Sequence, residues 1–581
     1  MHNTEVSTKV TQRYIVGAIL VIFILWTLSP ILNSAIIADD IPNSQRSAVL
    51  SQSDQSIMNY TVQATQQWVR NEGRLFPISV IENTVLFNYV HSRTIYKSLQ
   101  LLFIFALASL LGLLAQTLSR SRNIGLLVMT LFICALQVRY WYDPTLSFGL
   151  LLPSVGIKTL GSLILITKGI RSESRRQSNL LFAASAVLWS LALLQYEVII
   201  LLTIAVFFIS FHEQQAPQTR RLLGVASLTV VSFIYMTVSR ILRAGVTPSP
   251  AYQTNFDLQE VLPALKHQII GAIPLSVPYS RVDGRVGIFG ALRDLSVVGY
   301  FGMFTAVVAC VLLIRAINLP SLRTRIILLF VGLAFFFLPG IPTAISVRWQ
   351  QELSSGNAYL PVILQSLGTA LLLLACVLEF RAIIDRINSA SPRLSLALLW
   401  TGMGILGTGM GVTMVTNHAG TKYVVNRWSD FRTERDIFEA AARRGVFDDV
   451  PTNSVIVSES ADEFLWTNAT YLRWLGGPQV FKFMQPNDAS ACRAEMVLSC
   501  QQNVGARYMI KRDSGGEVSI LVALTKSWWK ASISEEELVG VRAFARSRLN
   551  LECGVSQAVK VRGWWSTQCG MRDIDIRKLK I

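Results

Sequence analysis

Long apolar runs recur along most of this sequence, and they constrain its fold more than any other feature. Many separate windows approach the ~20 apolar residues that a helix needs to cross a lipid bilayer. The chain has 581 residues, of which 51% are hydrophobic and only 15% are charged, a balance too apolar for an ordinary globular protein. The sequence therefore predicts a polytopic α-helical membrane protein.

We expect about eleven transmembrane helices. The first apolar run is too long for the core of a signal peptide, and no small-residue cleavage site follows it, so we expect it to be retained. Almost no loop separates the fifth and sixth runs, which indicates that one of them is short or broken. The predicted spans cover residues 14–37, 98–118, 124–140, 147–168, 179–194, 195–211, 222–241, 295–315, 326–345, 359–379 and 394–416.

The net charge of +17 would suggest nucleic acid as the partner of a soluble protein. Here the basic residues concentrate in alternate short loops, which is typical of loops that stay in the cytoplasm. This asymmetry predicts a cytoplasmic N-terminus and a C-terminal part on the outer side of the membrane, in the periplasm or the cell exterior. The cytoplasmic loops would hold Lys9, Arg13, Arg120, Arg122, Lys168, Arg171, Arg175, Arg176, Arg220, Arg221, Arg315, Arg323, Arg325, Arg381, Arg386 and Arg393.

Three of the predicted outside regions are long: two are loops of a membrane module, and the third is a C-terminal tail. Residues 1–416 form the predicted membrane module, whose first and second large outside loops cover about 38–97 and 242–294. The tail, 417–581, is polar, and its ~165 residues suffice for one core. Alternating residues at 454–458 and tryptophan pairs at 528–529 and 564–565 favour a small extracytoplasmic α/β domain there.

Four of the seven cysteines lie in the tail: Cys492, Cys500, Cys553 and Cys569. An even number confined to an outside domain favours disulfides, because that compartment is oxidising. Zinc is the rival interpretation, but the spacing contains no CxxC motif. We predict the two local pairs, Cys492 with Cys500 and Cys553 with Cys569, among the three possible connectivities.

Two adjacent carboxylates, Asp39 and Asp40, follow the first apolar run within a residue or so of the predicted outer membrane face. Neighbouring carboxylates repel each other, which can raise the pKa of one of them, a trait of general bases and metal ligands. The plainer interpretation is that the pair only caps a membrane helix. The residues that follow decide between the two.

Further charged residues gather at the same outer face. Gly73 and Pro77 bracket a turn that would hold Arg74 in a fixed direction, and Arg139 and Asp143 close the third span among aromatic residues. The aromatic rings alone are explained by the belt that forms at membrane interfaces. The charged pair is harder to dismiss, because an outside loop needs no positive charge for topology.

Glu197 and Arg348 each leave two interpretations open. An acid between two apolar runs is either a functional group or a buried partner for an arginine of a neighbouring span. Arg348 precedes Gly356 and Tyr359 in the loop before the tenth span. Its guanidinium is well shaped to hold a phosphate, and it would serve equally as a snorkelling anchor.

The sequence lacks several motifs that would indicate other chemistry. No GxxxxGK[ST] loop, no GxGxxG opening a helix and no HExxH motif occurs. The cytoplasmic loops are too short for a nucleotide-binding domain. Transfer chemistry at the outer face would therefore need a donor delivered through the membrane, which favours a lipid-linked one.

This order of motifs resembles the GT-C superfamily of integral membrane glycosyltransferases, and within it bacterial enzymes related to O-antigen glucosyltransferases that use polyprenyl-phosphate sugars. The resemblance covers about residues 14–380 and leaves out the tail. It is carried by Asp39-Asp40, Gly73-Arg74 with Pro77, Arg139 with Asp143-Pro144, Tyr196-Glu197, Ile273-Pro274-Leu275-Ser276, and Gly356 with Tyr359-Leu360-Pro361.

The resemblance implies an enzyme of the bacterial inner (plasma) membrane. It would move a sugar from a polyprenyl-phosphate donor to an acceptor of the cell envelope, such as lipopolysaccharide or another polysaccharide. Asp39 or Asp40 would deprotonate or position the acceptor hydroxyl. Arg74, Arg139 and Arg348 would stabilise charge on the departing lipid phosphate. The implied lipid-phosphate and substrate-binding residues are Arg74, Arg139, Asp143, Glu197, Arg348 and Tyr359.

We expect no obligatory cofactor, because only a carboxylate pair without clear further ligands is present; a divalent cation is the alternative. The expected partners are the polyprenyl-linked donor, a glycan or lipid-linked acceptor and membrane lipids, and no nucleic acid. Two other functions compete with the transferase. One is a transporter or non-catalytic envelope-assembly protein, although the charges cluster at one face rather than at the bilayer midplane. The other is an O-antigen polymerase or ligase.

Overall fold

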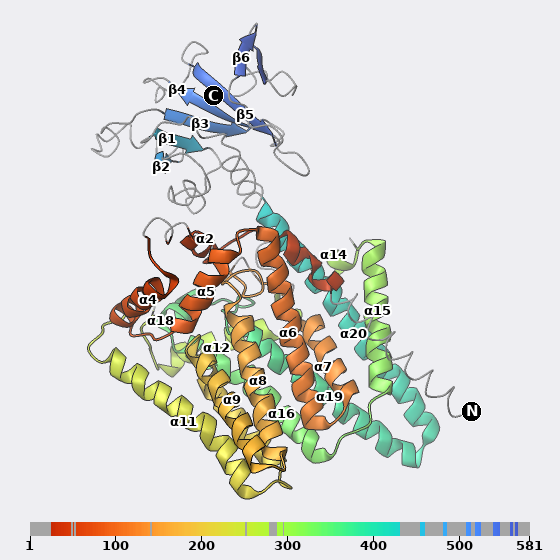
Figure 1. Cartoon of the computed structure of the whole chain (residues 1–581). Helices are drawn as coiled ribbons and strands as arrows, with labels where there is room; N and C mark the ends of the chain where they lie inside the picture. Colours follow the sequence, from red (N-terminus) through yellow and green to blue (C-terminus); the bar gives the residue numbers. More distant parts are fainter. Residues whose placement is uncertain are drawn as a thin grey trace. The chain divides into compact units, whose positions relative to one another are not determined.

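A computed structural model describes residues 25–47, 50, 54–139, 142–249, 252–277, 287–293 and 295–429, together with seven strands of the tail (Figure 1). The chain divides into two compact units. The first contains Met1–Asp39 and Met58–Trp428, and the second contains Asp40–Ile57 and Ser429–Ile581. The boundary therefore falls between the two neighbouring aspartates, Asp39 and Asp40.

The described part of the first unit is helical. Its long helices lie side by side in Figure 1 as a bundle, and the short helices α4, α5 and α18 lie near the end of the bundle that is uppermost in that view. The helices are η1 (Ser29–Asn33), α4 (Ile57–Glu72), α5 (Pro77–Tyr89), α6 (Arg93–Ser119), α7 (Arg122–Ala135), α8 (Leu151–Arg171), α9 (Arg175–Leu193), η2 (Glu197–Leu202), α10 (Thr203–His212), α11 (Gln218–Arg243), α12 (Leu258–Ala272), α14 (Ile288–Arg293), α15 (Val297–Arg315), α16 (Leu322–Phe337), η5 (Leu338–Gly340), α17 (Ile341–Ala344), α18 (Val347–Glu352), α19 (Val362–Ala390) and α20 (Pro392–Arg427).

Seven helical stretches among the described residues are long and apolar enough to cross a membrane, so the chain is a multi-pass membrane protein. They are α6, α8, α11, α15, α16 extended to Ala344, α19 and α20. Two of the other predicted spans correspond to shorter apolar helices, at Arg122–Ala135 and Glu197–His212. Most of the first predicted span lies outside the described residues, and the count of eleven stays a prediction.

Small residues let the long helices approach closely, as is common in membranes. The pairs α8–α9 and α16–α19 share extensive contacts. A Cβ added at Gly368 on α19 would lie 2.3 Å from the backbone nitrogen of Phe336 on α16. Ser162 of α8 and Ser185 of α9 hydrogen-bond across their interface, with the two hydroxyls 2.7 Å apart. The bundle therefore depends on backbone contact as much as on large apolar side chains.

The chain breaks off its helical course at residues 194–196, between α9 and η2, where the fifth predicted span meets the sixth. The sixth span itself is divided into η2 and α10, as expected for a short or broken helix. Three polar side chains hold the turn at residues 194–196. Lys158 of α8 donates to Glu82 of α5 and to the amide oxygen of Gln195, at 2.6 Å each. The amide nitrogen of Gln195 donates back to Glu82, also at 2.6 Å. Because the chain turns here instead of continuing as helix, Glu197 begins a new segment at the end of the bundle.

The loops at the opposite end of the bundle contact one another. Arg171 forms an ion pair with Glu213 at 2.6 Å, which joins the α8–α9 and α10–α11 connections. Asn123 donates to the backbone oxygen of Ala316 at 2.6 Å, which joins the start of α7 to the end of α15. These are the loops whose basic residues predicted a cytoplasmic position, and the structure brings them to one end.

The second unit contains a five-stranded sheet in the order β2-β1-β3-β4-β5. Strand β1 (Ser454–Ser458) pairs in parallel with β2 (Val480–Met484) and β3 (Arg507–Arg512), whereas β4 (Val518–Leu524) and β5 (Leu538–Ala545) continue it antiparallel. Strands β6 (Ala558–Val561) and β7 (Trp564–Thr567) form an antiparallel pair. Strand β1 coincides with the predicted alternation at 454–458. The four tail cysteines lie outside the described residues, so the disulfides and the α/β class stay predictions.

Candidate functional site

A pocket lies where several connections of the first unit meet, at the end of the bundle away from the mutually contacting loops. Its walls come from the turn after α4, the start of η2, the end of α11, the segment around residue 252, and α17–α18. The charged and aromatic residues that line it are Arg74, Tyr196, Glu197, Arg243, Tyr252, Arg348, Trp349 and Tyr359. Four of the residues selected from the sequence, Arg74, Glu197, Arg348 and Tyr359, are among them.

Arg74 and Glu197 form an ion pair in this pocket. A terminal guanidinium nitrogen of Arg74 lies 2.8 Å from Oε1 of Glu197, and the two side chains are 15% and 33% exposed. Burial opposes the charge on Arg74, but the Glu197 carboxylate outweighs it and raises the pKa of Arg74 above its ordinary value. Arg74 therefore stays cationic at any pH that the protein tolerates.

The pair retains unused hydrogen-bonding capacity. Nε of Arg74 and Oε2 of Glu197 are both buried, and neither has a hydrogen-bond partner in the structure. A buried donor or acceptor without a partner is costly, so such atoms at a pocket indicate that a bound molecule or water completes them. One free donor next to one free acceptor suits a ligand that carries hydroxyl groups.

Aromatic rings surround the Arg74 guanidinium. Its central carbon lies 4.9 Å from the ring centroid of Phe76, 5.1 Å from that of Tyr252 and 5.8 Å from that of Tyr196. Such cation–π contacts restrain the planar group without using its hydrogen-bond donors. Arg74 is therefore held in a fixed direction mainly by rings and by Glu197.

Two further aromatic residues that line the pocket, Trp349 and Tyr359, form a stacked pair. The rings of Trp349 and Tyr359 stack with centroids 3.6 Å apart. Gln268 of α12 fixes the backbone of Tyr359 from both sides: its amide oxygen accepts from the Tyr359 nitrogen at 2.8 Å, and its amide nitrogen donates to the Tyr359 oxygen at 3.2 Å. Tyr359 is thus positioned by a fully buried polar residue of another element.

Hydrogen bonds tie the connections together around the pocket. Glu72, the last residue of α4, accepts from the backbone nitrogen and the hydroxyl of Ser249, at 3.0 and 2.9 Å. The segment around residue 254 pairs with the start of α18, through a bridge between Thr254 and Ser346 and a bond from the Val347 nitrogen to the Gln253 oxygen at 3.1 Å. Regions far apart in the sequence are thereby held in one arrangement.

The two aspartates of the acidic pair are placed differently. Asp39 is exposed and belongs to the first unit, and it follows Ala38, whose positive φ of 53° turns the chain sharply. Burial raises the pKa of Tyr252, and the negative charge of Asp39 raises it further, as does that of Glu72, so Asp39 lies within electrostatic range of the pocket. Asp40 is buried and begins α2 (Asp40–Ser44) in the second unit.

Arg348 lies at the exposed rim of the pocket. Its Nε is 2.9 Å from Oε1 of Glu352, one turn later in α18, and both side chains are about half exposed. The guanidinium also lies over the Trp349 ring, 4.8 Å from its centroid. An exposed ion pair of this kind contributes little to stability, so Arg348 can exchange Glu352 for another anion at low cost.

Arg139 and Asp143 are not among the residues that line the pocket. They form a buried ion pair at 3.0 Å. Arg139 also donates to the Gly271 oxygen at 2.9 and 2.7 Å, and to the Gln137 oxygen at 2.8 Å. All its guanidinium nitrogens are therefore used inside the protein, where they join the end of α7 to α12.

Four of the charged and aromatic lining residues were not among the site residues chosen from the sequence: Tyr196, Arg243, Tyr252 and Trp349. A signal was present for Arg243. It lies at the outer end of a predicted span, where the positive-inside rule gives no reason for an arginine. Tyr196 was noted only as the neighbour of Glu197 in the resemblance. Tyr252 and Trp349 carried no signal of their own, because aromatic residues are expected at any membrane interface.

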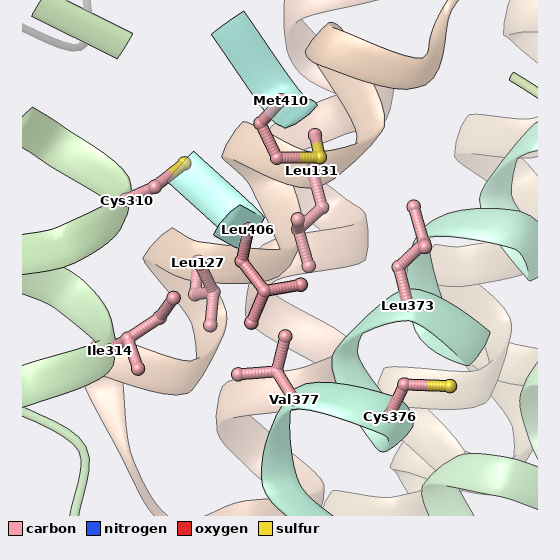
Figure 2. A pocket seen from close by; sticks show the side chains of 9 residues that line it. All are labelled: Leu127, Leu131, Cys310, Ile314, Leu373, Cys376, Val377, Leu406 and Met410. Atoms are coloured by element: carbon pink, nitrogen blue, oxygen red, sulfur yellow. The ribbon is translucent and has the colours of Figure 1, made fainter. Parts of the chain in front are cut away.

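The described residues offer no metal site, and another cavity that they line is apolar. No group of three or more His, Cys, Asp or Glu side chains in the described part of the chain is arranged to hold a metal ion. A second cavity lies between α7, α15, α19 and α20, and the side chains that Figure 2 labels there are all apolar or sulfur-containing. Without a polar group, that cavity offers no chemistry beyond contact with hydrocarbon.

No family model and no curated protein matches this chain. Solved structures of ArnT from Cupriavidus metallidurans are similar to it. The crystal structure bound to undecaprenyl phosphate is 10% identical, with a TM-score of 0.39, and the match covers 85% of this chain and 92% of that one. The apo structure is 13% identical, with a TM-score of 0.38, and the match covers 87% and 93%.

Proposed function

We propose that this protein is a membrane glycosyltransferase that moves a sugar from a polyprenyl-phosphate donor to a cell-envelope acceptor. The observation that carries the proposal is the gathering of Arg74, Glu197, Arg348 and Tyr359 around one pocket. These residues come from three separate stretches of the sequence, around residues 74, 197 and 348–359. Their charges, free polar atoms and aromatic rings suit a ligand that combines an anion with a sugar.

In the proposed reaction, a hydroxyl oxygen of the acceptor attacks the anomeric carbon of the donor sugar. The bond between that carbon and the phosphate oxygen breaks, and the electron pair leaves with the polyprenyl phosphate. The hydroxyl proton passes to a carboxylate. Asp39 is the better candidate for this base, because it is exposed and acts electrostatically on Tyr252 at the pocket. Asp40, which is buried, would orient the segment that carries it.

The arginines take different parts in this proposal. Arg348 can release Glu352 and bind the developing phosphate charge at the rim, with the paired hydrogen bonds that a guanidinium offers. Arg74 is already paired, so with Glu197 it would present one donor and one acceptor to sugar hydroxyls. Arg139 and Asp143 would act indirectly, by holding α12 and therefore Gln268 and Tyr359 in place.

The pocket is proposed to face the periplasm or the cell exterior. The loops at the other end of the bundle carry the excess of basic residues, which favours a cytoplasmic position for that end. A donor that reaches the outer face through the membrane is then accessible to the pocket. A general acid is not required, because phosphate is already a good leaving group. We also propose that no metal ion is obligatory, because the carboxylate pair has no clear further ligands in the sequence, so a chelator should leave transfer unchanged.

The test is sugar transfer from a polyprenyl-phosphate donor into envelope material, normalised to folded protein in the membrane. Asp39→Asn should insert normally and lose transfer by about a hundredfold or more. Asp40→Asn should lose less, because orientation tolerates more change than proton removal. The matched control is Asp54→Asn, since Asp54 is exposed and has a positive φ that asparagine also tolerates. Full transfer by the Asp39→Asn, Asp40→Asn double variant would reject the proposal.

A further inference from the structure

The charges that line the pocket do not balance. Three described lining residues are arginines, Arg74, Arg243 and Arg348, and one is a carboxylate, Glu197. Arg74 uses Glu197, and Arg348 has Glu352 beside it. Arg243 forms no ion pair with any residue that the structure describes, although it lies in the same pocket.

The position of Arg243 is restricted even though the residue is exposed. A Cβ added at Gly73 would lie 2.5 Å from Cγ of Arg243 and 3.3 Å from its Cα and Cβ. Gly73 has a φ of +63°, which glycine adopts without strain. The side-chain stem of Arg243 therefore packs directly on the backbone of Gly73, next to Arg74. A glycine here both turns the chain and leaves the space through which Arg243 reaches the pocket.

A plainer role for Arg243 is to complement the C-terminal end of α11, where a cation interacts favourably with the helix dipole. Arg240 satisfies that role equally well. Arg240 is exposed and belongs to the last turn of the same helix, three residues before Arg243. It does not line the pocket. The dipole therefore explains an arginine near the end of α11, but not the packing of Arg243 against Gly73.

We propose that Arg243 is the principal anion-binding residue of the pocket and that its ligand is a phosphate group. The inference deepens the proposed function, because that phosphate would be the one that links the donor sugar to its lipid. Arg243, which forms no ion pair with a described residue, can bind phosphate directly through two parallel hydrogen bonds. Arg74 would first have to give up Glu197, and Arg348, which assists at the rim, would have to give up Glu352. Arg243 is then a determinant of donor affinity, and it takes no part in proton transfer.

Binding is measured on the full chain in detergent or nanodiscs, by the change in tryptophan fluorescence, since Trp349 lies in the pocket. The probes are polyprenyl phosphate without sugar, the uncharged polyprenol and inorganic phosphate. Arg243→Gln should weaken polyprenyl-phosphate binding by about 10- to 100-fold, which is the worth of a charge-assisted hydrogen bond or two. Arg243→Lys should recover part of the loss, and polyprenol should bind all variants equally weakly.

Arg240→Gln is the matched control, because it removes the same charge from the same helix end. If it weakens binding as much as Arg243→Gln does, the effect is general electrostatics and the assignment is wrong. Competition by inorganic phosphate that depends on Arg243 would place a free phosphate in the same site. In kinetic assays, Arg243→Gln should raise the KM for the donor more than it lowers kcat. Wild-type protein that binds polyprenyl phosphate but transfers no sugar would reject the proposed function and leave Arg243 as an anion site.

Discussion

At the scale of single residues, the pocket depends on the close contact between the turn at Gly73 and the side chain of Arg243. Gly73 carries no side chain where Arg243 passes, and Arg74 follows immediately with its ion pair to Glu197. The sequence indicated Gly73 only as part of a turn. The structure adds that the missing side chain is needed for packing as well as for conformation.

Gly73→Ala should therefore be more harmful than an ordinary substitution at positive φ. The change forces a Cβ into the Arg243 side chain and also costs about 1 kcal/mol in backbone strain. Gly245→Ala is the control, because Gly245 has a φ of +85° and nothing within 4 Å of an added Cβ. We expect both variants to lose thermal stability and only Gly73→Ala to weaken polyprenyl-phosphate binding severalfold. Equal binding by the two variants would contradict the packing argument.

At the scale of elements, the break between α9 and η2 places Glu197 in the pocket. The near absence of a loop between two apolar runs predicted that one of them is short or broken. The side chains that bind Gln195 at the turn between α9 and η2 come from α5 and α8, which the sequence did not indicate. An ionisable group within a membrane span needs such partners, because an unpaired charge there is costly. Lys158 supplies the charge, and Glu82 and Gln195 satisfy it.

Lys158→Met should consequently destabilise the protein. It leaves Glu82 and Gln195 without their shared donor, at a cost of about 1–3 kcal/mol. Lys168→Met is a suitable control, since Lys168 is an exposed residue of the same helix. Thermal unfolding in detergent should show a lower Tm for Lys158→Met alone, with partial recovery when Glu82→Gln is added. The same Tm for both single variants would mean that the network does not hold the break.

At the scale of the whole molecule, the loop charges predict which end of the bundle faces outward. Single cysteines at Gln259 and Arg176 test this, in a background without other reactive thiols, because both residues are exposed and lie at opposite ends of the bundle. An impermeant thiol reagent added from outside should label the probe at Gln259 and spare the one at Arg176. Labelling in the reverse pattern would overturn the membrane topology and the proposed donor access with it.

The tail offers a separate test of the outside position. If its compartment is oxidising, Cys492–Cys500 and Cys553–Cys569 should be found as disulfides by peptide mapping without reduction. Each would stabilise the tail domain by roughly 2–4 kcal/mol, and reduction should lower its unfolding temperature. Four free thiols in the mapped peptides would reject the pairing and favour the metal interpretation.

The sequence by itself determined the membrane class, the apolar helices and the broken helix, because hydropathy and helix length are properties of contiguous residues. It also selected Arg74, Glu197 and Arg348 as charged residues at the predicted outer face, where an ionisable group is a functional candidate, and Tyr359 through the resemblance to a known family. Only the tertiary structure separated these residues from Arg139 and Asp143, whose hydrogen bonds to Gly271 and Gln137 join regions distant in the chain. Only the tertiary structure placed Arg243 in the pocket, because folding is needed to bring the end of α11 beside Gly73 and the other lining residues.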